Sequence, residues 1–368
     1  MLTMKFFTHF SRLFVGVLFI ISGLIKLNDP VGFSYKLTEY FGESVFNLPF
    51  FVPFSLTIAL FLVVLEVVLG FALLVGYRAK LTIKILLLLI VLFTFLTFYS
   101  AFFDVVKDCG CFGDALHLTP WQSFGKDIVL LIFSIILVCN IKNVKPLFSK
   151  KITQYLTFLS LLLSVFMGYW VLNHNPIHDF RPYKVGNNIQ KGMEIPADAP
   201  KTKVEMIFIY KVKGVDTEFS EKDLMKLPAG ATFVDRKDKI IEQGFEPPIH
   251  DFSMELDGSD YKEELLLEPK LLVFVAYDLT TANKSGMLLL EKLAQKAKAK
   301  GYKVIGMTGS AKDEIEKAKA AYHFSFDLYF CDATPLKTIE RANPSIVILN
   351  KGTVVQKVHY HDIDDLKL

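Results

Sequence analysis

Two cysteines separated by one glycine are the residues of this chain best suited to chemistry. Cys109 and Cys111 lie in the polar stretch 108–114, between two long apolar runs. An extended Cys-Gly-Cys backbone holds the two Cα atoms about 7 Å apart, which is beyond the usual disulfide span. Gly110 permits the tight bend that a bridge needs, and a strained disulfide is an oxidising one. The spacing therefore favours a pair that exchanges electrons.

The same residue types allow other readings. The two thiols can be inert groups at a membrane surface, or half of a metal site with His117. A complete zinc site needs two more ligands than this loop supplies, so we assign no metal. Cys331 can form a mixed disulfide with one of the loop thiols, or it can be a lone buried thiol, which is the commoner case for an isolated cysteine.

Composition excludes several classes of protein. The chain has 368 residues, 52% of them hydrophobic and 21% charged, whereas soluble domains carry about a quarter charged residues. The net charge of +3 is too small and too scattered to indicate a nucleic-acid partner. Four cysteines are too few for a disulfide-stapled scaffold, so each thiol is judged alone.

Apolar runs in the first half predict membrane spans and a lipid bilayer as partner. A helix needs about 17–25 apolar residues to cross the hydrocarbon layer. The runs at residues 10–27, 54–75, 83–103, 124–141 and 155–172 meet this requirement. The first is interpreted as an uncleaved span, because no small-x-small cleavage site follows it. Before the fourth, Thr119, Pro120 and Gln122 form the pattern of a helix capping box.

Basic residues predict the orientation of these spans. Lys5 and Arg12 precede the first span, and further Lys and Arg lie in 78–84 and 142–151. The opposite loops mix basic with acidic residues, so the N-terminus is predicted to be cytoplasmic. With five spans the thiol loop and the second half of the chain then face the oxidising periplasm of a bacterial inner membrane.

A carboxyl group inside the second span is a further candidate for chemistry. Glu66 lies about midway along that span, where an ionisable side chain is costly and usually functional. It is a candidate proton site beside a quinone. The alternative is a protonated Glu66 that bonds to a neighbouring helix through Thr94 or Thr97. Lys26 and Lys84 lie near span ends and are predicted to snorkel to the interface.

The second half of the chain reads as soluble. Residues 175–250 are predicted to be a periplasmic connection with a small β-rich segment, with strands near 204–211, 231–235 and 240–241. From residue 251 strands alternate with helices, which predicts an α/β sheet with helices on its faces. The predicted strands are 271–277, 303–308, 328–330, 345–349 and 353–359, and the helices 285–300, 311–322 and 335–342.

Residues 6–141 resemble the DoxX/MauE family of four-helix membrane proteins. The resemblance rests on Ser22-Gly23 with Lys26, Asp29-Pro30, Glu66 with Gly70, Cys109-Gly110-Cys111-Phe112-Gly113 and Thr119-Pro120-Trp121. It implies a four-helix bundle over residues 1–145, followed by a fifth transmembrane helix over 146–174. MauE-like proteins are associated with maturation of disulfide-rich partners and DoxX-like proteins with quinone-linked oxidation, so the resemblance implies membrane redox work.

Residues 251–368 look like a thioredoxin-type domain. The segment 273–278 stands where that fold has the strand before its active-site helix, and Pro344 stands where it has its cis-proline. The two positions that would be cysteine are Thr280 and Asn283, so the resemblance implies a degenerate domain without dithiol chemistry. Fusions of this arrangement are familiar in Bacteroidetes-type bacteria.

Together these observations predict a membrane all-α bundle followed by a soluble α/β thioredoxin-like domain. The favoured function is a thiol-disulfide or quinone oxidoreductase, in which Cys109 and Cys111 exchange electrons, a quinone accepts them and Glu66 handles protons. The soluble domain would hold or orient a periplasmic protein partner. The alternative is a non-enzymatic membrane scaffold whose thioredoxin-like domain binds such a partner.

Overall fold

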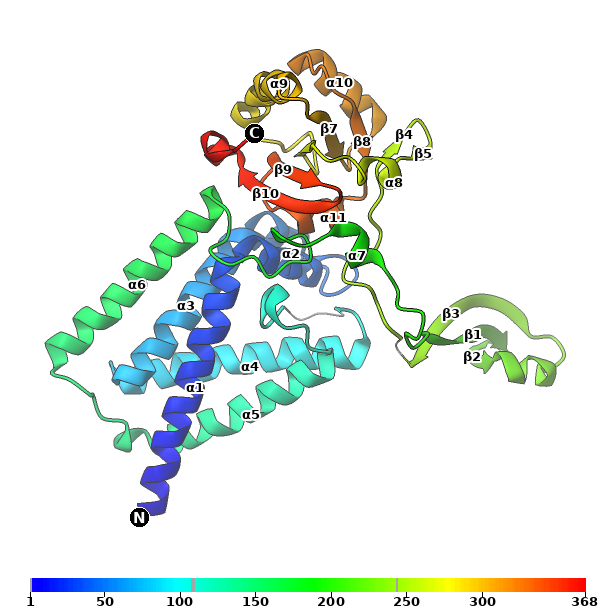
Figure 1. The fold of residues 1–368 in the computed structure, drawn as a ribbon. Helices are drawn as coiled ribbons and strands as arrows, with labels where there is room; N and C mark the ends of the chain where they lie inside the picture. The colour runs from blue at the N-terminus through cyan, green and yellow to red at the C-terminus, as the bar shows by residue number, and fades with distance from the viewer. Residues whose placement is uncertain (1, 107–109, 243) are drawn as a thin grey trace.

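The computed structural model describes residues 2–106, 110–242 and 244–368, and Figure 1 shows its arrangement. Helices of the first half form a bundle, and a sheet with its own helices lies over one end of it. The N-terminus and the C-terminus lie at opposite ends of the molecule.

Five helices in the described part of the chain are long and apolar enough to cross a membrane, as predicted. They are α1 (Leu2–Asn28), α3 (Ser55–Val75), α4 (Ala79–Phe103), α5 (Pro120–Cys139) and α6 (Lys150–Asn173). The predicted capping box starts α5: Thr119 Oγ1 accepts from Gln122 N, and the Gln122 side chain accepts from Thr119 N at 3.0 Å. Large apolar side chains such as Leu88 are exposed on the outside of these helices, where lipid can cover them.

One helix of the first half was not predicted. Helix α2 (Pro30–Phe41) follows α1 directly. Asp29 caps it, since its Oδ1 accepts from Gly32 N at 2.9 Å, and Pro30 occupies the first helical position. Helix α2 turns its buried side chains, Phe33, Leu37 and Tyr40 among them, toward the bundle. It therefore closes the end of the bundle nearest the larger sheet.

Glycines bring α1 and α3 close together. A Cβ atom at Gly70 would lie 2.8 Å from the carbonyl oxygen of Gly16, which is closer than real Cβ atoms come. Around this contact Val15 and Leu73 are fully buried. The two helices thus approach through small residues, as is usual in membranes.

The larger sheet has the strand order β10-β9-β6-β7-β8-β4-β5. Strand β6 pairs parallel with β7 and antiparallel with β9, β7 pairs parallel with β8, and β9 pairs antiparallel with β10. The strands are β4 (Glu255–Leu256), β5 (Ser259–Asp260), β6 (Leu271–Val275), β7 (Lys303–Thr308), β8 (Leu328–Phe330), β9 (Ser345–Asn350) and β10 (Thr353–His359).

Helices cover both faces of this sheet, as predicted. Helix α9 (Lys284–Ala299) buries Met287 and Leu290 on one face, where α10 (Lys312–Tyr322) also packs. Helices α8 (Lys262–Leu265) and α11 (Ala333–Ile339) pack on the other. The sequence suggests that residues 173–192 are only a connection, but Tyr183 and Ile189, which starts α7 (Ile189–Met193), belong to the core of this second face.

A small sheet of β1 (Lys203–Val212), β2 (Val215–Ser220) and β3 (Thr232–Glu242) has the order β2-β1-β3. It projects away from the rest of the molecule (Figure 1). Strand β3 is continuous where two short strands were predicted, and β2 was not predicted. The β1–β2 hairpin turns at Lys213 and Gly214, whose φ angles of 52° and 88° are those of a two-residue hairpin turn.

Candidate functional site

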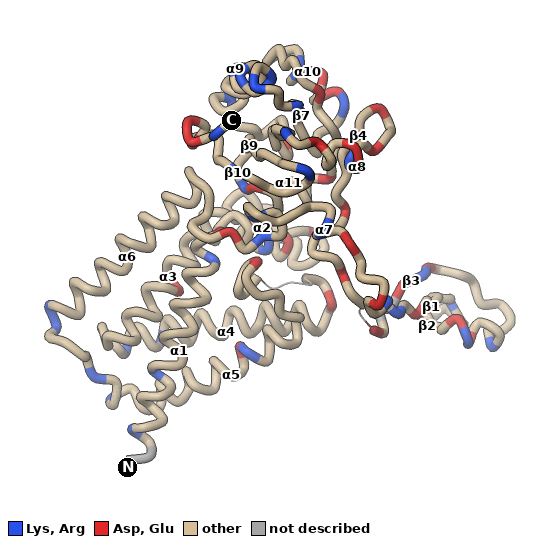
Figure 2. The backbone as a smooth tube through the Cα atoms, viewed as in Figure 1, with Lys and Arg blue, Asp and Glu red and all other residues tan. Residues whose placement is uncertain are grey.

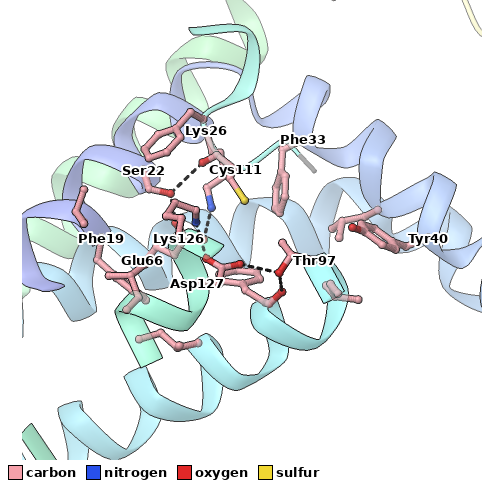
Figure 3. Close-up of a pocket in the computed structure, with 17 residues that line it drawn as sticks. Phe19, Ser22, Lys26, Phe33, Tyr40, Glu66, Thr97, Cys111, Lys126 and Asp127 are labelled. Atoms are coloured by element: carbon pink, nitrogen blue, oxygen red, sulfur yellow. Dashed lines mark hydrogen bonds and ion pairs between the residues drawn. The ribbon is translucent and has the colours of Figure 1, made fainter. Parts of the chain in front are cut away.

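The thiol loop lies at the end of the bundle that faces the larger sheet. Cys111 lines a cavity of about 50 Å³ between α1, α2, α3, α4 and α5, and Figure 3 shows its sulfur pointing into that cavity. Cys109 lies outside the described residues. Apolar and aromatic side chains form most of the walls, namely Leu18, Phe19, Phe33, Leu37, Tyr40, Ile90, Phe93, Leu96, Phe112 and Leu130.

The backbone around Cys111 is bent and anchored. Gly110 has φ +63° and Gly113 has φ +48°, both in the left-handed region that favours glycine. Ser22 of α1 donates through Oγ to the carbonyl oxygen of Cys111 at 3.0 Å. Gly110 thus uses a backbone conformation that glycine permits, and the bond from Ser22 ties the loop to α1.

Glu66 forms a buried ion pair with Lys26, which joins α3 to α1. The exposed fraction is 1% for Glu66 and 4% for Lys26. The prediction that Lys26 snorkels to the interface is wrong, because its ammonium group has a carboxylate partner inside the bundle and lies 5.2 Å from the ring centre of Phe33. The alternative given for Glu66, a bond to Thr94 or Thr97 of a neighbouring helix, is also wrong. Thr94 donates to the carbonyl of Ile90 instead.

A second ion pair lines the same cavity and was missed in the sequence. Lys126 Nζ lies 2.5 Å from Oδ1 of Asp127, and Thr97 Oγ1 donates to the other carboxylate oxygen at 3.0 Å. Asp127 is 3% exposed. Both residues lie two turns into α5, past its capping box and inside the run 124–141 that was predicted to be the fourth span. Adjacent opposite charges inside an apolar run were the signal that could have found them.

The surroundings of Cys111 act on its thiol in opposite directions. Burial raises the pKa of Cys111, and the Lys126 ammonium group, which has the largest effect of the nearby charges, opposes that rise. The thiolate form, which is the nucleophile, therefore depends on Lys126 for stabilisation. The cavity is smaller than the roughly 300–1,000 Å³ of ordinary ligand sites, so beside the thiol and the two ion pairs it has room for a small group rather than for a whole ligand of that size.

Cys331 and the degenerate thioredoxin positions lie elsewhere. Cys331 is fully buried in the core of the larger sheet, and burial raises its pKa to about 11. Asn283 caps α9 by accepting from Gly286 N at 3.1 Å, and Thr280 donates to Asp278 Oδ1 at 2.6 Å. The Asn343–Pro344 peptide bond is cis, as predicted. The structure thus separates these residues from the Cys111 cavity.

This arrangement defines a helical membrane domain with a thiol and paired charges at one end, joined to a sheet-rich C-terminal domain. Comparison with known proteins agrees for the first part. Residues 4–140 match the family model described as Methylamine utilisation protein MauE, so this part of the chain is a MauE-like membrane domain. Residues 204–243, which include most of β1 and all of β2 and β3, match a Domain of unknown function (DUF8463). Neither a curated protein nor a solved structure matches the chain.

Proposed function

We propose that this protein passes oxidising equivalents from a membrane quinone to thiols on the periplasmic side of a bacterial inner membrane. The observation that carries the proposal is the position of Cys111, which lies in an apolar cavity of the bundle beside the pairs Lys26–Glu66 and Lys126–Asp127. A carrier dissolved in lipid and a polar thiol can meet only near such a boundary. Cys109, outside the described residues, would be the second thiol of the pair.

The electrons and protons balance in two steps. In the first, the thiols of Cys109 and Cys111 form a disulfide and lose two electrons and two protons, which convert a quinone to a quinol. In the second, a partner dithiol reduces the Cys109–Cys111 disulfide by thiol–disulfide exchange. The partner is thereby oxidised to a disulfide, and Cys109 and Cys111 become thiols again. Lys126 would stabilise the Cys111 thiolate, and Glu66 would receive and release a proton in the cavity.

The soluble region would hold the partner rather than exchange electrons. The order β10-β9-β6-β7, with α9 after β6 and cis-Pro344 before β9, supports a thioredoxin-like domain. Because Thr280 and Asn283 replace the thiols of that fold, the redox step would belong to the membrane domain. Figure 2 shows Lys and Arg gathered at the far end of the bundle, away from the larger sheet, which supports a periplasmic sheet.

The test is quinone reduction by the purified full-length protein in detergent, with dithiothreitol as electron donor and a short-chain ubiquinone as acceptor. The expected result is a rate well above the uncatalysed one that disappears in Cys111→Ser and in Cys109→Ser. Cys139→Ser is the matched control, since Cys139 lies at the other end of α5. Equal rates in the wild type and Cys111→Ser would refute the proposal.

The scaffold is the second candidate, and the small sheet favours it. That sheet projects from the molecule and exposes apolar side chains such as Val215 and Phe233, exposed by 65% and 58%. The discriminating measurement is alkylation of Cys109 and Cys111 in intact membranes, with and without reductant. Thiols that stay reduced in aerated cells favour the scaffold, whereas thiols released only by reductant favour the redox function.

A further inference from the structure

The sheet-rich domain contacts the thiol loop directly. A chamber of about 450 Å³ lies between α2, the loop residues Gly110, Gly113 and Asp114, and α11 of the larger sheet. Lys26 and Phe33 line both this chamber and the cavity that holds Cys111, so the two spaces adjoin. A water-soluble thiol or oxidant that approaches Cys111 from this side passes through the chamber.

Arg341, just after α11, bridges the two halves of the chain. Its Nε donates to Asp29 Oδ2 at 2.9 Å, and its Nη2 lies 2.7 Å from the same oxygen. The same Nη2 donates to Asp114 Oδ2 at 3.0 Å. Asp29 ends α1 and caps α2, whereas Asp114 belongs to the thiol loop, in the short helical turn Gly113–Ala115. One guanidinium group therefore ties the loop to a fixed corner of the bundle.

The surroundings of Arg341 stabilise its bonds to Asp29 and Asp114. Its side chain is only 14% exposed, its Nη1 donates to the carbonyl of Lys337 at 2.5 Å, and it lies over the ring of Tyr35, 5.6 Å from the centre. Hydrogen bonds between charged groups are the strong ones, and a buried charge that loses its partner costs free energy. The bond from Arg341 therefore holds Asp114 in the position seen in the structure.

We propose that Arg341 is a positioning residue through which the sheet-rich domain holds the thiol loop in place and limits access to Cys111. The domain thus acts on the redox centre without a thiol pair of its own. Ser22 anchors the loop from α1 at the Cys111 carbonyl, and the bond that Arg341 donates to Asp114 is a second anchor, next to Gly113, whose φ of +48° lies in the region that glycine permits. This inference goes beyond the proposed function, since it concerns access to Cys111 whatever accepts the electrons.

The experiment measures the rate at which a membrane-impermeant maleimide labels Cys111 in the full-length protein, in detergent. All variants carry Cys109→Ser, which leaves one thiol in the loop and makes the readout independent of redox turnover. Label on Cys111 is counted by mass spectrometry. The variants are Arg341→Gln, Arg341→Lys, Asp114→Asn and the double change Arg341→Gln with Asp114→Asn. Arg236→Gln is the matched control, because Arg236 lies in the small sheet.

The expected result is a labelling rate about tenfold or more higher in Arg341→Gln and in Asp114→Asn, as for loss of a charge-assisted hydrogen bond. The double variant should label no faster than Arg341→Gln alone, because Asp114→Asn removes a bond that Arg341→Gln has already removed. Arg341→Lys should restore part of the protection, and Arg236→Gln should match the parent. A parental rate in Asp114→Asn, or a double variant whose effect is the product of the two single effects, overturns the proposal. Asp114→Asn keeps the Arg341–Asp29 contact, so it remains decisive if Arg341→Gln fails to fold.

Discussion

Removing one charge from the Lys26–Glu66 pair should destabilise the bundle strongly. In Glu66→Gln, Lys26 keeps its ammonium charge at a site where only 4% of the residue is exposed. Breaking a buried pair typically costs about 3–5 kcal/mol, because the remaining charge is left without compensation. Phe33 and Phe93, with ring centres 5.2 Å and 5.0 Å from Nζ, still favour the cation. We therefore expect a loss near the lower limit, about 3 kcal/mol.

Removing both charges should cost much less than removing one. In Lys26→Met with Glu66→Leu, apolar groups of similar volume replace the pair, and such replacements are often neutral or stabilising. The exposed pair Lys36–Glu39 provides the control, because its groups lie 3.6 Å apart and its side chains are 29% and 41% exposed. Glu39→Gln should change the free energy of unfolding by no more than about 1 kcal/mol.

The assay is reversible unfolding of the full-length chain in mixed micelles, followed by the fluorescence of Trp121 and Trp170. The reasoning fails if Glu66→Gln loses no more stability than Glu39→Gln, or if the double variant loses the sum expected for two independent sites. The double variant also separates stability from chemistry. If it is stable and no longer reduces quinone, the pair serves the reaction rather than the fold.

Three further predictions concern the fold. Burial lowers the pKa of His359 to about 4, so protonation below its ordinary value of 6.5 favours the unfolded chain. Stability should therefore fall by on the order of 2–3 kcal/mol as the pH drops from 6.5 to 4, and the pH dependence of the melting temperature should flatten in His359→Gln. Gly70→Ala should lose about 1–3 kcal/mol because its Cβ meets the Gly16 carbonyl, whereas Gly125→Ala, whose Cβ meets no described atom within 4 Å, should be neutral or stabilising in the same micelle assay. Thr119→Ala should cost about 1 kcal/mol through loss of the α5 cap, and unfolding should show no such loss in the exposed Thr217→Ala.

The membrane helices and most of the larger sheet follow from local sequence patterns. Long apolar runs have no stable place except in lipid or a core, so hydropathy finds the spans. The start of α5 is also clear from the sequence. Thr119 is its N-cap, Pro120 its first helical residue, and Gln122 completes the capping box. Helix α2 and strand β2 were missed although Asp29-Pro30 and Lys213-Gly214 give their start and turn signals. Both segments mix polar and apolar residues without a clear period, and a start or turn signal of two residues was not enough to predict an element there.

The site was only partly predictable, because partners on different helices leave no local trace. Glu66 was found since a carboxyl inside a span is unusual in itself. Lys26 and Lys126 lie near span ends, where lysines usually reach the interface, and the rule fails for both. Both lysines stay inside the bundle because each has a carboxylate partner there. Glu66 of α3 pairs with Lys26, and Asp127, which accepts from Thr97, pairs with Lys126. Such contacts depend on how helices pack.

The junction between the two halves shows why charged residues of a soluble region can be buried. Next to the Arg341 bridge, Arg181 and Glu340 are 3% and 2% exposed, and Lys357 lies 2.6 Å from Asp179. Buried ion pairs add little net stability, but any other arrangement leaves charges without partners. These pairs therefore fix how the segment around Asp179 lies against Glu340 and β10, whereas the orientation of the larger sheet over the bundle rests on the bonds from Arg341 to Asp29 and Asp114. If the proposed redox function holds, a fixed orientation would let a partner thiol bound to the sheet-rich domain meet the loop always from the same direction.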